Sequence, residues 1–134
     1  MIVADTNLVV YFVVKGDFTG AAERVRSLDR DWVVPSLFRH ELLNVLTTHV
    51  RTGRLDRDKA IRAFVRGTSL VRFWKAEPPV DEILNLALRG GCAGYDAEFV
   101  WLAEEIGCRL ETTDQQVINK FPDVAVGITE FSKG

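Results

Sequence analysis

The stretch of sequence that decides the fold is Ile2-Val3-Ala4-Asp5-Thr6-Asn7, in which a short β-branched run is followed at once by polar residues. A brief apolar run rich in Val and Ile predicts a buried strand. Similar runs recur between longer segments of helical periodicity, and we place strands at about 2–4, 32–34, 70–74, 109–112 and 124–128. Strands that alternate with helices predict an α/β fold, in which helices cover both faces of a mostly parallel sheet.

Helical periodicity and capping signals fill the intervals between these strands. The clearest helices are expected at 36–52, 57–66, 80–89 and 96–106. Asp56 stands where an N-cap is favoured, and Gly67 and Gly107 stand where helices commonly end. The run from Leu8 to Val14 stays ambiguous, because its Val and Tyr residues favour a strand whereas Asp5-Thr6-Asn7 leaves scarcely any room for a turn.

Length and composition indicate one compact domain spanning residues 1–134. The chain is 47% hydrophobic and 27% charged, which excludes collagen-like and disordered classes. Cys92 and Cys108 form neither a CxxC pair nor a disulfide framework, so no zinc site is indicated and a reduced setting is expected. The apolar run at 8–14 is far shorter than the roughly 20 residues of a membrane span, so we expect a soluble, cytoplasmic protein.

Two acidic residues directly follow predicted strands. Asp5 follows the strand at 2–4, and Asp114 follows the strand that ends Leu110-Glu111-Thr112-Thr113. The ligand crevice of an open parallel sheet lies outside the carboxyl ends of its strands, so both positions favour a functional role. Asp is also a good N-cap, and a purely capping role stays open for each of them.

A third acid, Asp96, lies at the start of the helix expected at 96–106. At 100° per residue it shares the apolar face with Val100 and Ala103. Glu98 falls about 160° away from that face, on a side expected to meet solvent. Burying a lone carboxylate is costly, so Asp96 requires a partner, a proton or a metal ion.

Glu41 is the fourth acid, about one turn into the helix expected at 36–52. Taken alone, it fits a solvent-facing position on an amphipathic helix. Acids that each lie near the carboxyl end of a strand would, however, share one end of the sheet. Crowded carboxylates repel one another, and a hard divalent cation such as Mg²⁺ or Mn²⁺ relieves that repulsion.

Such a site suits the hydrolysis of phosphodiesters. A bound divalent ion can generate a hydroxide-like nucleophile, orient an in-line attack and neutralise the leaving oxygen. Short polar residues stand beside the acids and suit support of the ligands or contact with phosphate; they are Thr6, Asn7, Thr112 and Thr113.

Four motifs occur in order along the chain: Ile2-Val3-Ala4-Asp5-Thr6-Asn7, Val34-Pro35-Ser36-Leu37-Phe38-Arg39-His40-Glu41-Leu42, Tyr95-Asp96-Ala97 leading into Leu102-Ala103, and Thr112-Thr113-Asp114. The ordered set resembles the PIN domain family, and specifically its VapC-type toxin ribonucleases. The resemblance implies a three-layer α/β/α sandwich with a five-stranded parallel sheet, and an endoribonuclease that cuts a structured RNA with Mg²⁺ or Mn²⁺. It also implies that the catalytic, metal-binding carboxylates are Asp5, Glu41, Asp96 and Asp114.

The same resemblance implies protein partners, because many such toxins form homodimers and are silenced by a small VapB-like antitoxin in the active-site groove. Two positions depart from the family's pattern. Glu111 stands where a strand residue is usually apolar, which puts the local packing in question. Gln115-Gln116 supply no further acid after Asp114, which puts a second metal ion in question.

The same residues allow several alternative interpretations. His40-Glu41 begins like a zinc-protease helix, but Asn44 stands where the second His is required. No phosphate-binding loop of the G-x-x-x-x-G-K type occurs. A catalytically silent PIN-like module that binds RNA or protein without cutting stays open, and so do a DNA substrate and a role in RNA processing. A response to metal separates the silent module from the enzyme.

The net charge of −2 hides an uneven distribution of charge. Residues 49–75 carry eight Lys and Arg against two acids, whereas the rest of the chain carries nine against seventeen. A solvated helix face is the simple interpretation. The functional interpretation is a track for RNA phosphates, with Arg51, Arg54, Arg62 and Arg66 as candidate contacts.

Overall fold

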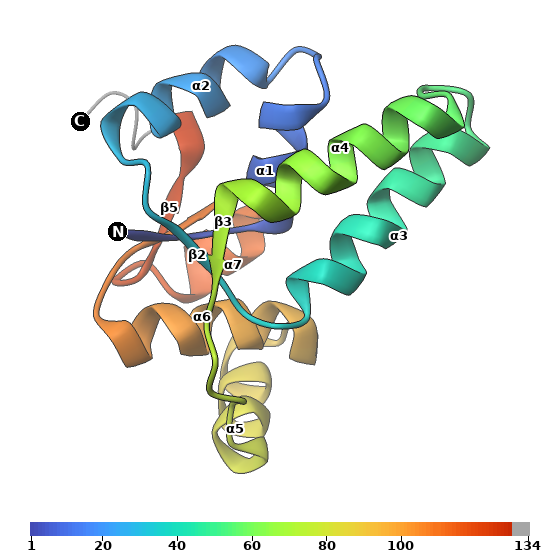
Figure 1. Cartoon of the computed structure of the whole chain (residues 1–134). Helices are drawn as coiled ribbons and strands as arrows, with labels where there is room; N and C mark the ends of the chain where they lie inside the picture. The colour runs from blue at the N-terminus through green and yellow to red at the C-terminus, as the bar shows by residue number, and fades with distance from the viewer. Residues whose placement is uncertain (130–134) are drawn as a thin grey trace.

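The computed structural model describes residues 1–129 and arranges them around a five-stranded sheet (Figure 1). The strands are β1 (Ile2–Ala4), β2 (Trp32–Val34), β3 (Val71–Phe73), β4 (Leu110–Thr112) and β5 (Ala125–Gly127). Their order is β3-β2-β1-β4-β5, and every neighbouring pair is parallel. All five strands expected from the sequence are therefore confirmed, each to within one residue at either end.

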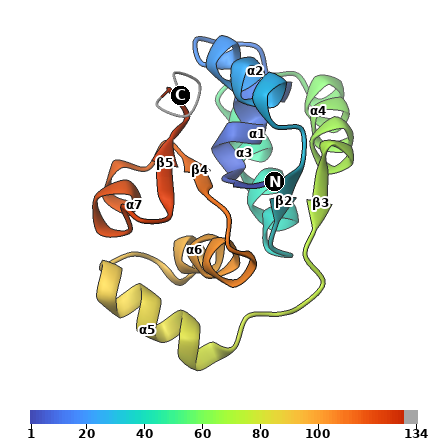
Figure 2. The same ribbon diagram turned by 90° about the vertical axis from the view of Figure 1, so that its left-hand side faces the viewer.

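The helices form the two outer layers. They are α1 (Thr6–Val13), α2 (Thr19–Leu28), α3 (Phe38–Arg51), α4 (Arg57–Leu70), α5 (Val80–Gly90), α6 (Gly94–Ile106) and α7 (Gln115–Lys120). The chain adds β2 and β3 on one side of β1, and β4 and β5 on the other. Right-handed crossovers therefore place α1 to α4 on one face and α5 to α7 on the other, as Figure 2 shows. None of the helices within residues 1–129 is long and apolar enough to cross a membrane.

The ambiguous run after β1 is helical. Asp5 keeps an extended backbone and α1 begins at the next residue, so the chain makes no turn between strand and helix. Leu8, Val9 and Val10 are all buried in the core. Burial against the sheet and the neighbouring helices outweighs the strand preference of the Val residues, which is a weak and context-dependent term.

The expected end of a helix at Gly67 is wrong, because α4 continues to Leu70. Gly67 is buried where α4 crosses α3 and α1. A Cβ atom there would lie 2.9 Å from Leu42 and 3.3 Å from Val9, so this glycine permits a close helix approach and does not end the helix. The other two signals are confirmed: Asp56 caps α4 by accepting a 2.8 Å hydrogen bond from the Lys59 amide, and Gly107 ends α6 with φ of 69°.

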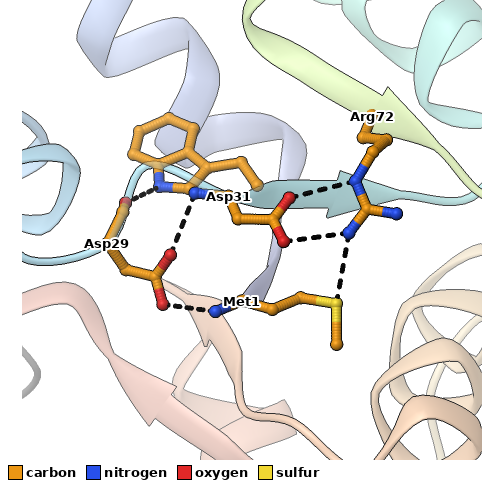
Figure 3. Close-up of polar contacts among 5 residues, drawn as sticks. Met1, Asp29, Asp31 and Arg72 are labelled. Carbon is orange, nitrogen blue, oxygen red and sulfur yellow. Dashed lines mark hydrogen bonds and ion pairs between the residues drawn. The ribbon is translucent and has the colours of Figure 1, made fainter.

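The amino ends of three strands are joined by charged side chains (Figure 3). The Met1 amino group, just before β1, pairs with Asp29 at 2.6 Å. Arg72 of β3 binds both carboxylate oxygens of Asp31, at 3.1 and 2.9 Å. The hydrogen bonds from Arg72 are the main reason that the pKa of Asp31 is lowered. At this end of the sheet, each acid drawn in Figure 3 has a cationic partner.

Candidate active site

The opposite end of the sheet contains a topological switch point between β1 and β4. These two strands are adjacent, yet the chain leaves them on opposite faces of the sheet, through α1 from β1 and through α7 from β4. Open parallel sheets bind ligands in the crevice that such a divergence creates. Asp5 follows β1, Thr112 ends β4, and Asp114 follows two residues later.

Asp5 is the N-cap residue of α1, but its side chain makes no capping hydrogen bond. Its carboxylate Oδ2 instead accepts a 2.7 Å hydrogen bond from the Thr112 hydroxyl, across the switch point. Burial raises the pKa of Asp5 to about 6, against the hydrogen bonds from Thr112 and the Thr6 backbone, and the charges of Asp96 and Asp114 add to the rise. The Asp5 carboxylate therefore contacts Thr112 across the crevice and does not cap α1.

Asp114 has the capping role that the sequence left open for it. As the N-cap of α7, it accepts hydrogen bonds from the amides of Gln116 (2.9 Å) and Val117 (3.3 Å) through Oδ1. Its own amide donates to the Thr112 hydroxyl oxygen at 3.1 Å. Thr112 thus links Asp114 to Asp5, and the cap holds the Asp114 carboxylate beside the crevice.

Asp96 reaches the same crevice from the first turn of α6. Its side chain is half-buried, and its pKa is raised by burial and by the charge of Asp114. Asp96 and Asp5 also line one small cavity together with Phe99, Leu110 and Thr112. The prediction that Asp96 points along the buried face of its helix is consistent with this position.

Glu41 lies in the first turn of α3 and is half-buried. Its Oε1 atom accepts a 2.8 Å hydrogen bond from the Thr6 hydroxyl. Burial is the largest cause of its raised pKa, and the charges of Asp5, Asp96 and Glu98 add to it. The solvent-facing alternative for Glu41 is therefore wrong, because α3 turns this edge of its apolar face toward α1.

The four predicted acids are thus brought to one end of the sheet, and two of the four predicted polar residues contact them. Thr6 and Thr112 are buried and hold Glu41 and Asp5 respectively. Asn7 is exposed on α1, and Thr113 is half-buried. Among residues 1–129, neither of these two side chains hydrogen bonds to the acids, so a role for them depends on a bound ligand.

The expectation that Glu98 faces solvent, apart from the site, is wrong. Glu98 is half-buried, and its charge contributes to the raised pKa of Glu41. Its own pKa is raised by burial and by Glu77, which accepts a 2.9 Å hydrogen bond from Ser36. The helix α6 crosses the end of the sheet, so its two sides meet different parts of one acidic cluster. The only indication in the sequence that Glu98 lies near Asp96 is its position two residues later in the chain.

Glu111 is fully buried in β4, where the sequence departs from the expected apolar residue. In the parallel register it lies beside Ala4 and Val126, and neither of its carboxylate oxygens has a hydrogen-bond partner among the described residues. Burial raises its pKa to about 8. The strand accommodates the residue as a buried neutral acid that faces away from the crevice, since its neighbour Thr112 points into it.

The electrostatics of the crevice suit a divalent cation. Within residues 1–129, none of the four acids forms an ion pair with Lys, Arg or the amino terminus. In the same part of the chain, no three acidic, His or Cys side chains are arranged to hold an ion by themselves. Mg²⁺ commonly takes one or two carboxylates, keeps several waters and binds substrate phosphate, so the residues present fit such an ion.

The candidate arginines separate onto two faces of the hairpin formed by α3 and α4. Arg54, Arg62 and Arg66 line a groove that begins at Asn7, beside the acids. Arg51 lines a different, mainly apolar groove together with Leu43, Val50, Ile61 and other residues. The four arginines therefore do not form one surface, because Arg51 lies on a different side of the hairpin from Arg62 and Arg66 of α4 and from Arg54 of the connecting segment.

Comparisons with known proteins agree with this architecture. The PIN domain family model matches residues 2–125. Ribonuclease VapC3 of Pyrobaculum aerophilum is 32% identical over 127 residues, which cover 90% of this chain and 95% of that protein. Exonuclease VapC9 of the same organism is 33% identical over 81 residues, or 60% of each chain. The crystal structure of PAE2754 from Pyrobaculum aerophilum has a TM-score of 0.80 at 22% identity, and the match covers 98% of this chain and 92% of that one. This chain therefore belongs to the PIN domain family and is related to VapC ribonucleases.

Proposed function

We propose that this protein is an Mg²⁺- or Mn²⁺-dependent endoribonuclease that hydrolyses phosphodiester bonds in a specific structured RNA. One observation carries the proposal: Asp5, Glu41, Asp96 and Asp114 meet at the switch point of the sheet without a cationic partner in the described residues. The similarity to a protein named Ribonuclease VapC3 supports RNA as the substrate.

Asp5 and Asp96 are the carboxylates best placed to hold the ion directly, since they line one cavity and the charge of Asp96 adds to the raised pKa of Asp5. Asp114 completes the binding site from the start of α7, through water or directly. When bound, the divalent ion lowers the pKa of a water molecule and neutralises charge on the phosphate. The Thr112 hydroxyl keeps Asp5 turned toward that position.

Glu41 is suited to orient the attacking water. Thr6 donates to its Oε1 atom and fixes the side chain, and within residues 1–129 no side chain hydrogen bonds to Oε2, which can accept a hydrogen bond from water. Asn7 and Thr113 are the polar groups available to contact the substrate phosphate.

The proposal is tested by cleavage of RNA by the purified protein with Mg²⁺, with Mn²⁺ and with EDTA. Cleavage is expected only with metal, and each of Asp5→Asn, Glu41→Gln, Asp96→Asn and Asp114→Asn should remove most of the rate. Glu105→Gln is the matched control, because Glu105 is an exposed acid further along α6. Undiminished cleavage in EDTA, or in all four variants, would contradict the proposal. Binding of RNA with no response to metal would identify a silent module.

We further propose that the protein is the toxin of a toxin-antitoxin pair, silenced by a small VapB-like antitoxin. The relationship to proteins named VapC3 and VapC9 supports this role. Co-expression with the product of a short neighbouring reading frame is expected to protect growing cells and to yield a stable complex. Growth arrest that the neighbouring product does not relieve would contradict the pairing.

A second copy of the chain is the other partner we propose. The helix α5 carries an exposed apolar stripe at i, i+4 and i+8, where Val80, Leu84 and Leu88 are 75%, 55% and 79% exposed. A stripe of this kind is typical of a surface covered by another protein. Sedimentation velocity is expected to show a dimer that Leu84→Asp with Leu88→Asp converts to a monomer. A wild-type monomer at micromolar concentration would contradict this.

A further inference from the structure

A groove of about 980 Å³ lies along α1, the segment after it, α3 and α4, and its lining begins at Asn7, two residues after Asp5. We call it the basic groove, because its lining includes five cationic side chains: Lys15, Arg54, Lys59, Arg62 and Arg66. Asp17 is the only acid that lines it among the described residues. The groove therefore combines positive charge with a position next to the start of α1, the helix that follows Asp5.

Helical periodicity connects the basic groove to the crevice. On α3, Glu41 of the acidic cluster is followed at i+4 and i+8 by Val45 and His49, which both line the groove. On α1, Asn7 is followed at i+4 by Tyr11, and both of these residues line it. Eight residues of helix rise about 12 Å, so the groove continues about two helical turns beyond the acids.

The cations of the basic groove lack acidic partners. Within residues 1–129, none of the five forms an ion pair, whereas Arg57, Arg72 and Arg89 outside the groove each do. A second, smaller groove shares Lys15 and Arg66 with the basic groove and adds Arg26 and Arg30, against one acid, Glu23. Positive charge therefore continues onto α2, and an anion longer than one phosphate is the ligand that fits it.

An aromatic side chain stands at the wall of the basic groove. Phe18 is 50% exposed and its ring packs on Tyr11, with centroids 4.9 Å apart. Exposed aromatic rings that are held by a neighbour act as platforms for unpaired nucleic acid bases, each worth about 1–3 kcal/mol. A base inside a duplex is already stacked on its neighbours, so such a platform favours a single-stranded segment.

We propose that the basic groove holds a single-stranded segment of the RNA on one side of the scissile phosphate, with a base stacked on Phe18. Lys59 and Arg62 contact the phosphates of that segment. This inference rests on the proposed ribonuclease function and specifies how its substrate lies. The opposite face of the hairpin, with Arg51 and Arg57, takes no part in RNA binding.

The test is RNA binding in EDTA, measured by fluorescence anisotropy of a labelled single-stranded oligonucleotide and of a blunt duplex. Binding without metal does not depend on catalysis, so failure of the groove and failure of the ribonuclease proposal are distinguishable. Lys59→Ala with Arg62→Ala should weaken single-strand binding at least tenfold. The slope of log Kd against log salt should fall by about 1.4, since each lost phosphate contact contributes about 0.7. Arg51→Ala with Arg57→Ala removes the same net charge and should leave Kd within about twofold.

Phe18 is tested separately, because stacking and charge have different signatures. Phe18→Ala should weaken single-strand binding by about 5- to 100-fold with an unchanged salt slope, and Phe18→Trp should restore it. Equal losses in the Lys59/Arg62 and Arg51/Arg57 double variants would overturn the proposal, and so would unchanged binding in both the Lys59/Arg62 and the Phe18→Ala variants. Unchanged RNA binding with loss of a co-purified protein partner would also overturn it and assign the groove to that partner.

Discussion

Acidic residues at the two ends of the parallel sheet lie in opposite electrostatic environments. At the amino end, Asp29 and Asp31 are paired with the Met1 amine and with Arg72 (Figure 3). At the carboxyl end, Asp5 and its three companions have no cationic partner among the described residues. The pKa of Asp31 is accordingly lowered, whereas that of Asp5 is raised to about 6.

The difference separates acids whose charge is already paired from acids whose charge has no cationic partner among the described residues. A charge-paired acid near the surface is nearly neutral in its effect on stability and has no unmet electrostatic demand. Partly buried acids that repel one another destabilise the folded chain until a cation binds. A cation that binds at the carboxyl end would therefore relieve repulsion, whereas a cation at the amino end would not. This difference is the physical basis for proposing the functional site at the carboxyl end.

The largest effect is expected from a substitution at the carboxyl end of the sheet. Asp5→Asn should lower the metal-dependent cleavage rate on the order of 1,000-fold or more, because several kcal/mol of charge stabilisation are lost. It should also abolish the rise in melting temperature that Mg²⁺ produces in the wild type, since an ion that binds only the folded state stabilises it. Asp31→Asn, at the other end, should leave the rate and the Mg²⁺ response unchanged. Loss of both properties in Asp31→Asn would contradict the division.

Glu111 adds a third environment, a buried acid whose carboxylate oxygens have no hydrogen-bond partner among the described residues. Its pKa rises from 4.5 unfolded to about 8 folded, so the folded state binds the extra proton and stability falls as pH increases from about 4.5 to 8. At pH 7 the cost is about 3 kcal/mol. Glu111→Met should raise the free energy of unfolding in urea by about that amount at pH 7, and by much less at pH 4. An equal gain at both pH values would show that packing and not ionisation is responsible.

A smaller effect is expected from Asp5 in the absence of metal. Its folded pKa of about 6 exceeds the ordinary value of 3.8, so its charge destabilises the fold above pH 6 and the effect disappears below pH 4. Because the side chain is partly exposed, the full shift is discounted, and Asp5→Asn should stabilise the metal-free protein by about 1–2 kcal/mol at pH 8. Urea unfolding in EDTA at pH 8 and pH 4 measures this. Destabilisation at pH 8 would mean that the Thr112 hydrogen bond outweighs the buried charge.

The smallest effect on stability is expected from a substitution at the amino end of the sheet. Asp31→Asn should change the melting temperature by only a few degrees, because the pair with Arg72 is about half exposed on both sides. The lowered pKa of Asp31 means that any contribution is present at neutral pH and is lost as pH falls through the folded pKa. Thermal melts at pH 7 and pH 3 test both statements. A large loss at pH 7 would show that this cluster is a structural requirement.

Local patterns were enough to predict much of the fold and the core of the site. The five strands followed from short apolar runs, because a buried strand needs little more than β-branched residues and flanking breaks. Asp5, Asp96 and Asp114 followed from their positions after strands or at the start of a helix, because parallel topology brings those positions together. Asp56 and Gly107 followed from capping chemistry, which acts within one turn of helix.

The sequence by itself therefore determined the α/β class, the position of the acidic site at one end of the sheet and the uneven charge. Only the tertiary structure decided that α4 continues through Gly67, that Glu98 joins the cluster and that Arg51 is separated from Arg54 and Arg62. These features depend on which helix faces meet, and on distances between residues far apart in the chain. Periodicity defines the faces of a helix, but packing decides what each face contacts.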